Sequence, residues 1–477
     1  MSRIAFVNPA YGPGHYSRAS RSPAVAKSAT VYYPVWLCYA AGWAESRGHD
    51  VSILDAAATL LPHEDVVRSL LEKRPDVVVV DTTTPSIASD LRLATLVRDA
   101  LPSVRIVAVG THASACPEAV LGSCQALDAV AVGEYDQSIE EYASASDPSG
   151  VPGLVCRGAG KVASYAPREP MGDLDRLPFV TRVYKDHLDV RDYFFSTARH
   201  PMIMTITGHG CPNRCSWCLY PQTMHGHRYR VRSPANVVDE FEYVSKELPG
   251  VREIGVEDDT FTARRSRARE ICELILRRGL KVRWWANVRA DLDLETMRLM
   301  KRAGCRLFIV GFESGSQDVL DRMHKGIRLD QAETFMKNAR RLRVSVRACF
   351  VVGQPGETIE SMNRTLRYAI RLNPDTAQFF PMIVYPGTEA FETALSCGWL
   401  TTDDFSAWLT EKGTHNYVLK TGELTPEAVN DFVSHATKAF YLRPRVVLRT
   451  ALGMATSWQE LRRVFHVIRR FAGFLTG

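Results

Sequence analysis

The chain has 477 residues, of which 45% are hydrophobic and 23% are charged, and its formal net charge is +6. These values are typical of a globular protein with two or three cores and exclude a disordered chain. The charge is too small for this length to indicate a nucleic-acid partner. There is no run of eighteen apolar residues and no signal peptide, and the eleven cysteines form an odd, scattered set. We therefore expect a protein of the reducing cytoplasm.

The first 145 residues alternate short Val- and Ile-rich runs with segments of helical length. Helices are predicted over segments such as 34–48 and 87–101, and the predicted strands are 4–7, 51–54, 77–80, 104–109 and 129–132. Continuous apolar runs of this kind belong to parallel strands that are buried on both faces. The pattern predicts a doubly wound, Rossmann-like α/β domain over residues 1–145, whose ligand lies beyond the carboxyl ends of the strands.

Small, polar side chains follow the predicted strands of this domain. They suit hydrogen bonding to amides and phosphate, and the candidate binding residues are Thr83, Thr84, Gly110, His112 and Glu134. No Gly-x-Gly-x-x-Gly follows the first strand, which argues against a nicotinamide or flavin dinucleotide.

The next segment, 146–198, is rich in Gly, Pro and charge and predicts a linker with one hairpin. From residue 202 onward strands and helices alternate with the period of βαβ units. Ser233 and Pro234 are a suitable N-cap and first residue for a helix over 235–248. The predicted strands are 202–206, 253–257, 282–286, 306–310, 346–352 and 377–383. They predict a partial (β/α)6 TIM-like barrel over 199–400, followed by a small helical region over 401–477.

Three cysteines follow the first barrel strand within eight residues: Cys211, Cys215 and Cys218. A structural zinc site needs four protein ligands, and iron–sulfur clusters usually take four thiolates. A compact trio leaves one metal position open, and an open iron can hold a small molecule.

This loop, with Trp217 before the last cysteine, resembles the motif of the radical S-adenosylmethionine (SAM) superfamily. The resemblance implies that the three cysteines hold a 4Fe–4S cluster whose open iron binds SAM. It also implies cleavage of SAM to a 5′-deoxyadenosyl radical, which takes a hydrogen atom from the substrate. An electron donor such as flavodoxin or ferredoxin is then required.

The other barrel strands are each followed by a polar or Gly-rich segment, at the position where parallel barrels carry their catalytic groups. These segments match the successive SAM motifs of the superfamily. The resemblance implies contacts of Glu257 with the amino group of SAM, Arg289 with its carboxylate, Glu313 and the adjacent Ser314 with its ribose, and Gly353 with adenine. Trp217 is expected to pack around the cluster and adenine, while Tyr220, His225 and His227 are candidate catalytic residues facing the substrate.

The N-terminal half resembles the cobalamin-binding domain that precedes the barrel in many of these enzymes. The residues that carry the resemblance are Asn8-Pro9, Pro34, Gly48-His-Asp50, Gly110-Thr-His112 and Gly133-Glu134. Cobalamin is therefore expected at Thr83, Thr84, Gly110, His112 and Glu134. The absence of Asp-x-His-x-x-Gly predicts that no histidine lies beneath cobalt. The alternative is a scaffold domain without the cofactor.

Within the superfamily, 218–223, 226–230 and 257–262 look most like the hopanoid-associated members, and the layout is similar to that of aminoglycoside radical diol dehydratases. Both imply rearrangement or dehydration of a sugar or cyclitol, free or lipid-linked. A cobalamin-dependent radical C-methyltransferase is the alternative, and a non-catalytic metal-binding protein is a third hypothesis. The basic, amphipathic segments 441–449 and 461–475 predict either a helix packed on the barrel or peripheral contact with an anionic membrane.

Overall fold

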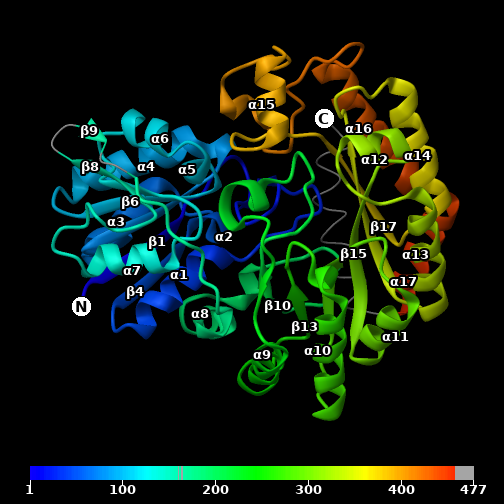
Figure 1. Cartoon of the computed structure of the whole chain (residues 1–477), viewed down its shortest axis with the longest axis horizontal. Coiled ribbons are helices and arrows are strands. Elements are labelled where there is room, and N and C mark those ends of the chain that lie inside the picture. Colours follow the sequence, from blue (N-terminus) through cyan, green and yellow to red (C-terminus); the bar gives the residue numbers. More distant parts are fainter. Residues whose placement is uncertain (159–160, 163–164, 457–477) are drawn as a thin grey trace.

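A computed structural model describes residues 1–158, 161–162 and 165–456 of the chain. Two parallel sheets organise it, one in each half of the sequence (Figure 1). None of the helices in the described part of the chain has the length and apolar character that a bilayer span requires.

The first sheet has the strand order β4-β1-β5-β6-β7-β8-β9. Its parallel strands are β1 (Arg3–Asn8), β4 (Asp50–Asp55), β5 (Val77–Thr82), β6 (Arg105–Gly110) and β7 (Ala129–Ala131). The order reverses between β1 and β5, so their carboxyl ends form the switch point at which ligands of such sheets bind. The doubly wound fold predicted for this half is confirmed.

Alternating valines of β5 pack into apolar clusters on the two faces of this sheet. Val77 and Val79 belong to one apolar cluster and Val78 and Val80 to another. The helices of this half are α1 (Val35–Ser46), α2 (Ala56–Thr59), α3 (His63–Lys73), α4 (Ile87–Ala100), α5 (Thr111–Ala115), α6 (Pro117–Ser123) and α7 (Asp136–Ser144). Helix α1 packs against α7 on one face, and α3 packs against α4 on the other.

The segment predicted to be a linker carries defined structure. The antiparallel strands β8 (Leu154–Gly158) and β9 (Lys161–Val162) extend the first sheet, and α8 (Val180–His187) packs against α1 and against β10 (Met202–Thr205). The domain boundaries at 145 and 198 stay predictions. The first sheet itself continues past residue 145 into β8 and β9.

The second sheet consists of six parallel strands in sequence order, as the partial barrel predicts. They are β10 (Met202–Thr205), β13 (Glu253–Val256), β14 (Trp284–Val288), β15 (Cys305–Glu313), β16 (Ser345–Val352) and β17 (Thr376–Pro381). The helices between them are α9 (Pro234–Glu247), α10 (Arg265–Arg277), α11 (Leu294–Arg302), α12 (Gln317–Arg322), α13 (Leu329–Leu342) and α14 (Ile359–Leu372). The Ser233 hydroxyl caps α9 by accepting from the amide of Asn236, as predicted.

The C-terminal region closes the far edge of this sheet and reaches back to the first domain. It contains α15 (Glu389–Ser396), η6 (Phe405–Trp408), α16 (Pro426–Tyr441) and α17 (Pro444–Thr456). Helix α16 packs on β17, while η6 packs on the end of β5 at η1 (Thr84–Ser86). Residues 457–477, including all of the predicted amphipathic segment 461–475, lie outside the described residues.

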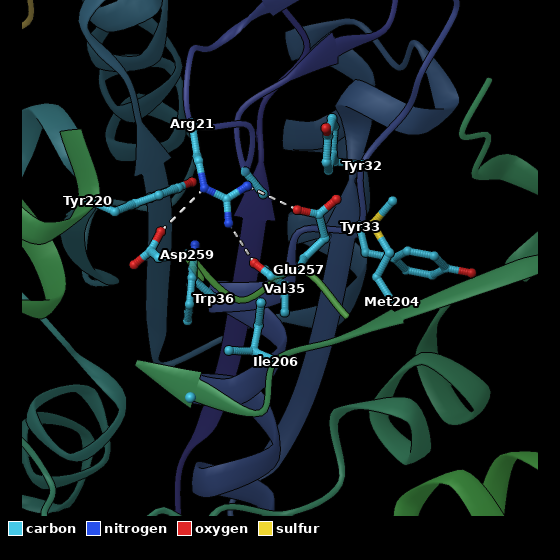
Figure 2. A pocket seen from close by; sticks show the side chains of 12 residues that line it. Arg21, Tyr32, Tyr33, Val35, Trp36, Met204, Ile206, Tyr220, Glu257 and Asp259 are labelled. Carbon is cyan, nitrogen blue, oxygen red and sulfur yellow. Dashed lines mark hydrogen bonds and ion pairs between the residues drawn. The ribbon is translucent and has the colours of Figure 1, made fainter. Parts of the chain in front are cut away.

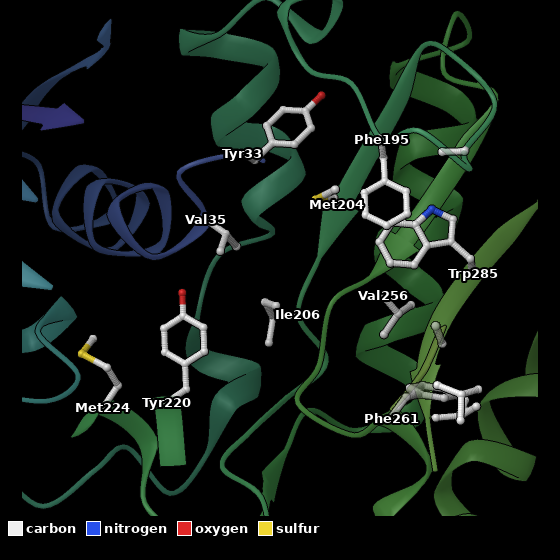
Figure 3. Close-up of a cluster of buried hydrophobic side chains, with 14 of the residues drawn as sticks. Tyr33, Val35, Phe195, Met204, Ile206, Tyr220, Met224, Val256, Phe261 and Trp285 are labelled. Atoms are coloured by element: carbon white, nitrogen blue, oxygen red, sulfur yellow. The ribbon is translucent and has the colours of Figure 1, made fainter. Parts of the chain in front are cut away.

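One apolar cluster joins the two halves. It runs from the first sheet through α1 and α8 to the barrel strands. Figure 3 shows Val35 of α1 near Ile206 and Tyr220, with Phe195 stacked on Trp285 of the barrel at a ring distance of 4.5 Å. The ligand edges of both sheets are therefore held against a shared core.

Candidate active site

The cysteine loop is held by hydrogen bonds to its own carbonyl groups. The side-chain amide of Gln222 donates to the carbonyl oxygens of Cys215, Ser216 and Cys218 at 2.9–3.3 Å. His227 places Nδ1 3.1 Å from the carbonyl oxygen of Cys211. His227, predicted to face the substrate, thus contacts the backbone of the loop through this nitrogen.

The three cysteine sulfurs are not gathered as closely as a single zinc ion requires. A zinc ion with Zn–S bonds of about 2.3 Å holds any two sulfurs within about 4.6 Å of one another. The three sulfurs do not form a group that lies within 4.8 Å of one another in the described residues. Burial raises the pKa of the Cys218 thiol well above its usual range, so cluster binding has to displace protons from this loop.

The acidic segment after β13 is held by an arginine from the first domain. Arg21 donates to Oε2 of Glu257 at 3.0 Å and, more weakly, to Oδ1 of Asp259 at 3.3 Å, and it also reaches the carbonyl oxygens of Glu257 and Asp258. Figure 2 shows this guanidinium between the two carboxylates, across the cavity from Ile206. The charge of Glu257, predicted to contact the amino group of SAM, is therefore compensated by Arg21 in the structure.

The carboxylate of Asp258 has a different role from its two neighbours. It accepts hydrogen bonds from the amide and hydroxyl of Thr207 at 2.5 and 2.6 Å. Asp258 is fully buried, so it fixes the start of the cysteine loop on the end of β13.

Glu313 and Arg289 lie on the same side of the barrel as the cysteines. Glu313 ends β15 with φ +62° and pairs with Lys325 at 2.5 Å. The Lys325 ammonium also lies 5.7 Å from the centre of the Trp217 ring. Arg289 donates to the carbonyl oxygens of Lys325 and Gly326. The structure therefore gathers three predicted SAM residues around Lys325.

Ser314 and Gly353 occupy more structural positions. The Ser314 hydroxyl is fully buried and contacts Thr365 at 3.2 Å, so it braces the turn after β15. Gly353 has φ +84°, and a Cβ there would lie 2.7 Å from the ring of Tyr417. Tyr417 donates to the Gly353 carbonyl oxygen at 2.6 Å, so a C-terminal side chain covers the glycine predicted to approach adenine.

The polar residues at the strand ends of the first domain hydrogen-bond within that domain, and His112 also contacts the second half. Thr83 contacts the hydroxyl of Tyr16 at 2.8 Å, and Thr84 contacts Nδ1 of His112 at 3.1 Å. Burial lowers the pKa of His112 to about 4, so this ring is neutral. The His112 ring packs edge-on against Phe405 of η6 at 5.2 Å, and Gly110 has φ +101°.

Glu134 is committed to a polar cluster that joins the two domains. Its Oε1 lies 3.0 Å from Nδ1 of His209 and 2.8 Å from Nδ1 of His225, and both its oxygens accept from Arg230. These three partners follow β10 within or beside the cysteine motif. Glu134, predicted to contact cobalamin, instead has its carboxylate occupied by barrel residues.

A small enclosed cavity lies between the two domains. Its volume is about 20 Å³, enough for one water molecule. Arg21, Tyr32, Trp36, Tyr220, Glu257 and Asp259 are among its lining residues (Figure 2). Tyr220, predicted to be catalytic, therefore faces the boundary between the predicted cobalamin and SAM sites.

Residues 205–369 match the family model of the radical SAM superfamily, and residues 21–143 match that of the B12 binding domain. An uncharacterized methyltransferase of Pyrococcus horikoshii is 30% identical over 421 residues, which make up 87% of this chain and 89% of the relative. The chain belongs to the radical SAM superfamily. The anaerobic magnesium-protoporphyrin IX monomethyl ester cyclase of Rubrivivax gelatinosus is 26% identical over 405 residues, covering 82% of this chain and 69% of the cyclase.

The fold of this radical SAM enzyme also matches a solved structure over its full length. The radical SAM methyltransferase TsrM of Kitasatospora setae, with cobalamin and a [4Fe-4S] cluster bound, gives a TM-score of 0.72 at 19% identity. The match covers 99% of this chain and 100% of that chain. The predicted superfamily, two-domain fold and cofactors (4Fe–4S cluster, SAM and cobalamin) are confirmed, and the non-catalytic alternative is excluded.

The boundary between the domains has the polar character that cobalamin requires. Three buried atoms there have no hydrogen-bond partner within the described residues: Oγ1 of Thr111, the hydroxyl of Tyr135 and Nε2 of His225. Unpaired buried groups are costly, so a ligand that both donates and accepts suits this position. A corrin ring carries amide side chains of that kind.

Sequence reasoning missed three residues of this site, namely Arg21, Lys325 and Tyr417. Arg21 lies 236 residues before Glu257, and Tyr417 lies 64 residues after Gly353. Neither has a motif of its own. Lys325 is the exception, because a basic residue soon after the Glu313 segment was a usable signal for a charge partner.

Proposed function

We propose that this enzyme is a cobalamin-dependent radical C-methyltransferase that acts on a small organic substrate. The observation that carries the proposal is the meeting of Tyr220, after the cysteine loop, with Trp36 of the B12-binding domain, their ring centres 5.7 Å apart. When bound, the cluster and SAM supply a radical that removes a hydrogen atom, and cobalamin supplies a methyl group. A substrate between the two cofactor sites is within reach of both.

The names of the compared proteins support methyl transfer over dehydration or rearrangement of a sugar. Both the relative from P. horikoshii and the structural neighbour TsrM are called methyltransferases. The cyclase from R. gelatinosus shows that another outcome occurs among the relatives. A sugar or cyclitol substrate, free or lipid-linked, is retained only as a proposal.

The protein's own residues would divide the work as follows. Cys211, Cys215 and Cys218 would hold the cluster. Lys325 would place its charge next to Glu313 and Trp217, where SAM is expected. Around SAM we retain Glu257, Arg289 and Gly353, and around cobalamin we retain Thr83, Thr84, Gly110 and His112.

The products formed from SAM test this proposal without a known substrate. Enzyme reconstituted anaerobically with iron, sulfide and hydroxocobalamin, and given a reductant, should release both S-adenosylhomocysteine and 5′-deoxyadenosine. Methyl transfer makes the first product, and radical formation makes the second. If loaded enzyme makes 5′-deoxyadenosine but no S-adenosylhomocysteine, dehydration or cyclisation is the better hypothesis. Cys397→Ala, an exposed cysteine outside the loop, is the matched control for loss of the cluster.

Two partner predictions complete the proposal. A flavodoxin or ferredoxin would supply the electron. Peripheral membrane contact would use α17, whose Val447, Leu448 and Leu452 are all more than half exposed beside Arg445 and Arg449. Leu442, just before this helix, is also more than half exposed. Co-sedimentation with anionic but not with neutral vesicles would support the membrane contact.

A further inference from the structure

The cluster around Glu134 is one of the most buried charged groups at the domain boundary. The side chains of His209, His225 and Arg230 are at most 4% exposed, and that of Glu134 is 9% exposed. Burial alone would raise the pKa of Glu134, but His209, His225 and Arg230 together hold it well below its usual range. Glu134 is therefore an ionised carboxylate that can only accept hydrogen bonds.

This carboxylate determines which ring nitrogen of His225 carries the proton. Nδ1 of His225 lies 2.8 Å from the ionised oxygen, so Nδ1 must be the donor. In the neutral ring Nε2 then has a free lone pair. Nε2 of His225 is buried and has no hydrogen-bond partner among the residues that the structure describes. The ring is thus fixed with an unused acceptor.

The surroundings of His225 indicate where a partner for this acceptor would come from. Its ring centre lies 4.2 Å from that of Trp36 and 5.7 Å from that of Tyr220, and both of these side chains line the interdomain cavity. The preceding residue, Met224, contacts Ser114 of the B12-binding domain. The charge of Asp136 at the start of α7 also reaches His225. His225 therefore lies where the two domains meet, beside two of the side chains that line the cavity.

A metal ion is a poor occupant for this cluster. Glu134, His209 and His225 could supply three ligand atoms within 4.8 Å of one another. However, the guanidinium of Arg230 contacts both oxygens of Glu134. A metal ion would have to displace this guanidinium from Glu134. It would also have to replace the Nδ1 protons of His209 and His225, because a histidine nitrogen binds a metal through its lone pair.

We propose that Glu134 is a positioning residue that holds His225 in the Nδ1–H form, so that Nε2 accepts a hydrogen bond from an N–H or O–H group of a ligand bound between the domains. Such a group is present on the amide side chains of the corrin and on a polar substrate. A buried acceptor selects strongly against ligands that lack the donor, because they leave it unpaired. The idea that a substrate supplies the donor rests on the proposed function, whereas the assignment of the His225 tautomer does not.

Nuclear magnetic resonance of the full-length protein labelled with 15N-histidine tests the tautomer directly. The His225 signals, identified by their loss in His225→Phe, should show a protonated Nδ1 and an unprotonated Nε2 at neutral pH. Glu134→Gln keeps an oxygen acceptor for Nδ1–H, so it should preserve the tautomer. An Nε2–H tautomer in the wild type would overturn the proposal.

Ligand binding tests the acceptor and separates the two sources of the donor. If the corrin supplies it, hydroxocobalamin should shift the Nε2 signal, and His225→Phe should weaken hydroxocobalamin binding roughly tenfold. If the substrate supplies it, His225→Phe should bind hydroxocobalamin as the wild type does. With a cell extract added as the source of substrate, the same variant should form less S-adenosylhomocysteine than the wild type. His49→Phe is the control, since His49 is a buried histidine of the B12-binding domain that lies near Glu140 rather than near Glu134.

Two results would refute this role of Glu134 and His225. One is a His225→Phe variant that folds normally and matches the wild type in both hydroxocobalamin binding and S-adenosylhomocysteine formation. The other is stoichiometric binding of Zn²⁺ or Co²⁺ that is lost in Glu134→Gln, which would make the cluster a metal site. Failure to detect any S-adenosylhomocysteine in the wild type would refute the methyltransferase proposal but leave the tautomer measurement standing.

Discussion

Arg21 is the side chain through which the B12-binding domain neutralises the acidic segment of the barrel. Replacing Arg21 by alanine removes the hydrogen bonds to Glu257 and Asp259 and those to two carbonyl oxygens. Glu257 keeps a hydrogen bond from the Asn287 amide at 2.8 Å, but its Oε1 already has no partner within the described chain. Two carboxylates with nearly buried side chains would lose their shared cation.

The cost follows from the exposure of the three side chains. Removing one member of a fully buried ion pair costs about 3–5 kcal/mol, whereas an exposed pair contributes about 0–1 kcal/mol. The side chain of Arg21 is 34% exposed, and those of Glu257 and Asp259 are 8% exposed. We therefore expect Arg21→Ala to lower the free energy of unfolding by about 2–3 kcal/mol.

Denaturant unfolding with Arg3→Ala as the control measures this loss. Arg3 and Asp76 form an ion pair in which both side chains are nearly half exposed, so that variant should change stability by less than about 1 kcal/mol. A double-mutant cycle of Arg21→Ala with Asp259→Asn should give a coupling energy of about 1 kcal/mol or more. Coupling indistinguishable from zero, or equal losses in the two single arginine variants, would refute the reasoning.

Other perturbations test the site. Cys211→Ala, Cys215→Ala and Cys218→Ala should each abolish the iron–sulfur absorption, and Cys272→Ala should keep it; equal loss in Cys272→Ala would contradict the ligand assignment. Glu313→Gln should weaken SAM binding by about 1.5–3 kcal/mol in calorimetry, and unchanged affinity would place Glu313 outside the SAM site. Gly353→Ala should lower the midpoint of thermal unfolding, because φ is +84° and Cβ would lie 2.7 Å from Tyr417, whereas Gly250→Ala, with open space around it, should not. Burial raises the pKa of Glu357 from 4.5 to about 7, so the folded state binds this proton more tightly than the unfolded chain. Its contribution to stability is therefore lost as pH rises from 4.5 to about 7. Glu357→Gln should gain stability relative to the wild type over that range, and a difference independent of pH would contradict the shift.

The sequence was sufficient to predict the strands of both sheets and the three-cysteine loop, because both depend on local patterns. Continuous Val and Ile runs such as Val77–Val80 predict buried parallel strands wherever they occur. The spacing of Cys211, Cys215 and Cys218 likewise needs only eight residues of chain. Polar segments after the strands could be predicted to share one edge, since parallel strands bring their carboxyl ends together.

Only the tertiary structure decided how the polar residues at those edges pair. The sequence suggested that Glu134 contacts cobalamin and that Glu257 contacts the amino group of SAM, but it could not show that Arg230 and Arg21 already contact these carboxylates. Such pairs join residues about 100 to 240 positions apart, and no periodicity relates them. Charge pairing across a domain boundary depends on the packing of two separate sheets, which the shared apolar core determines.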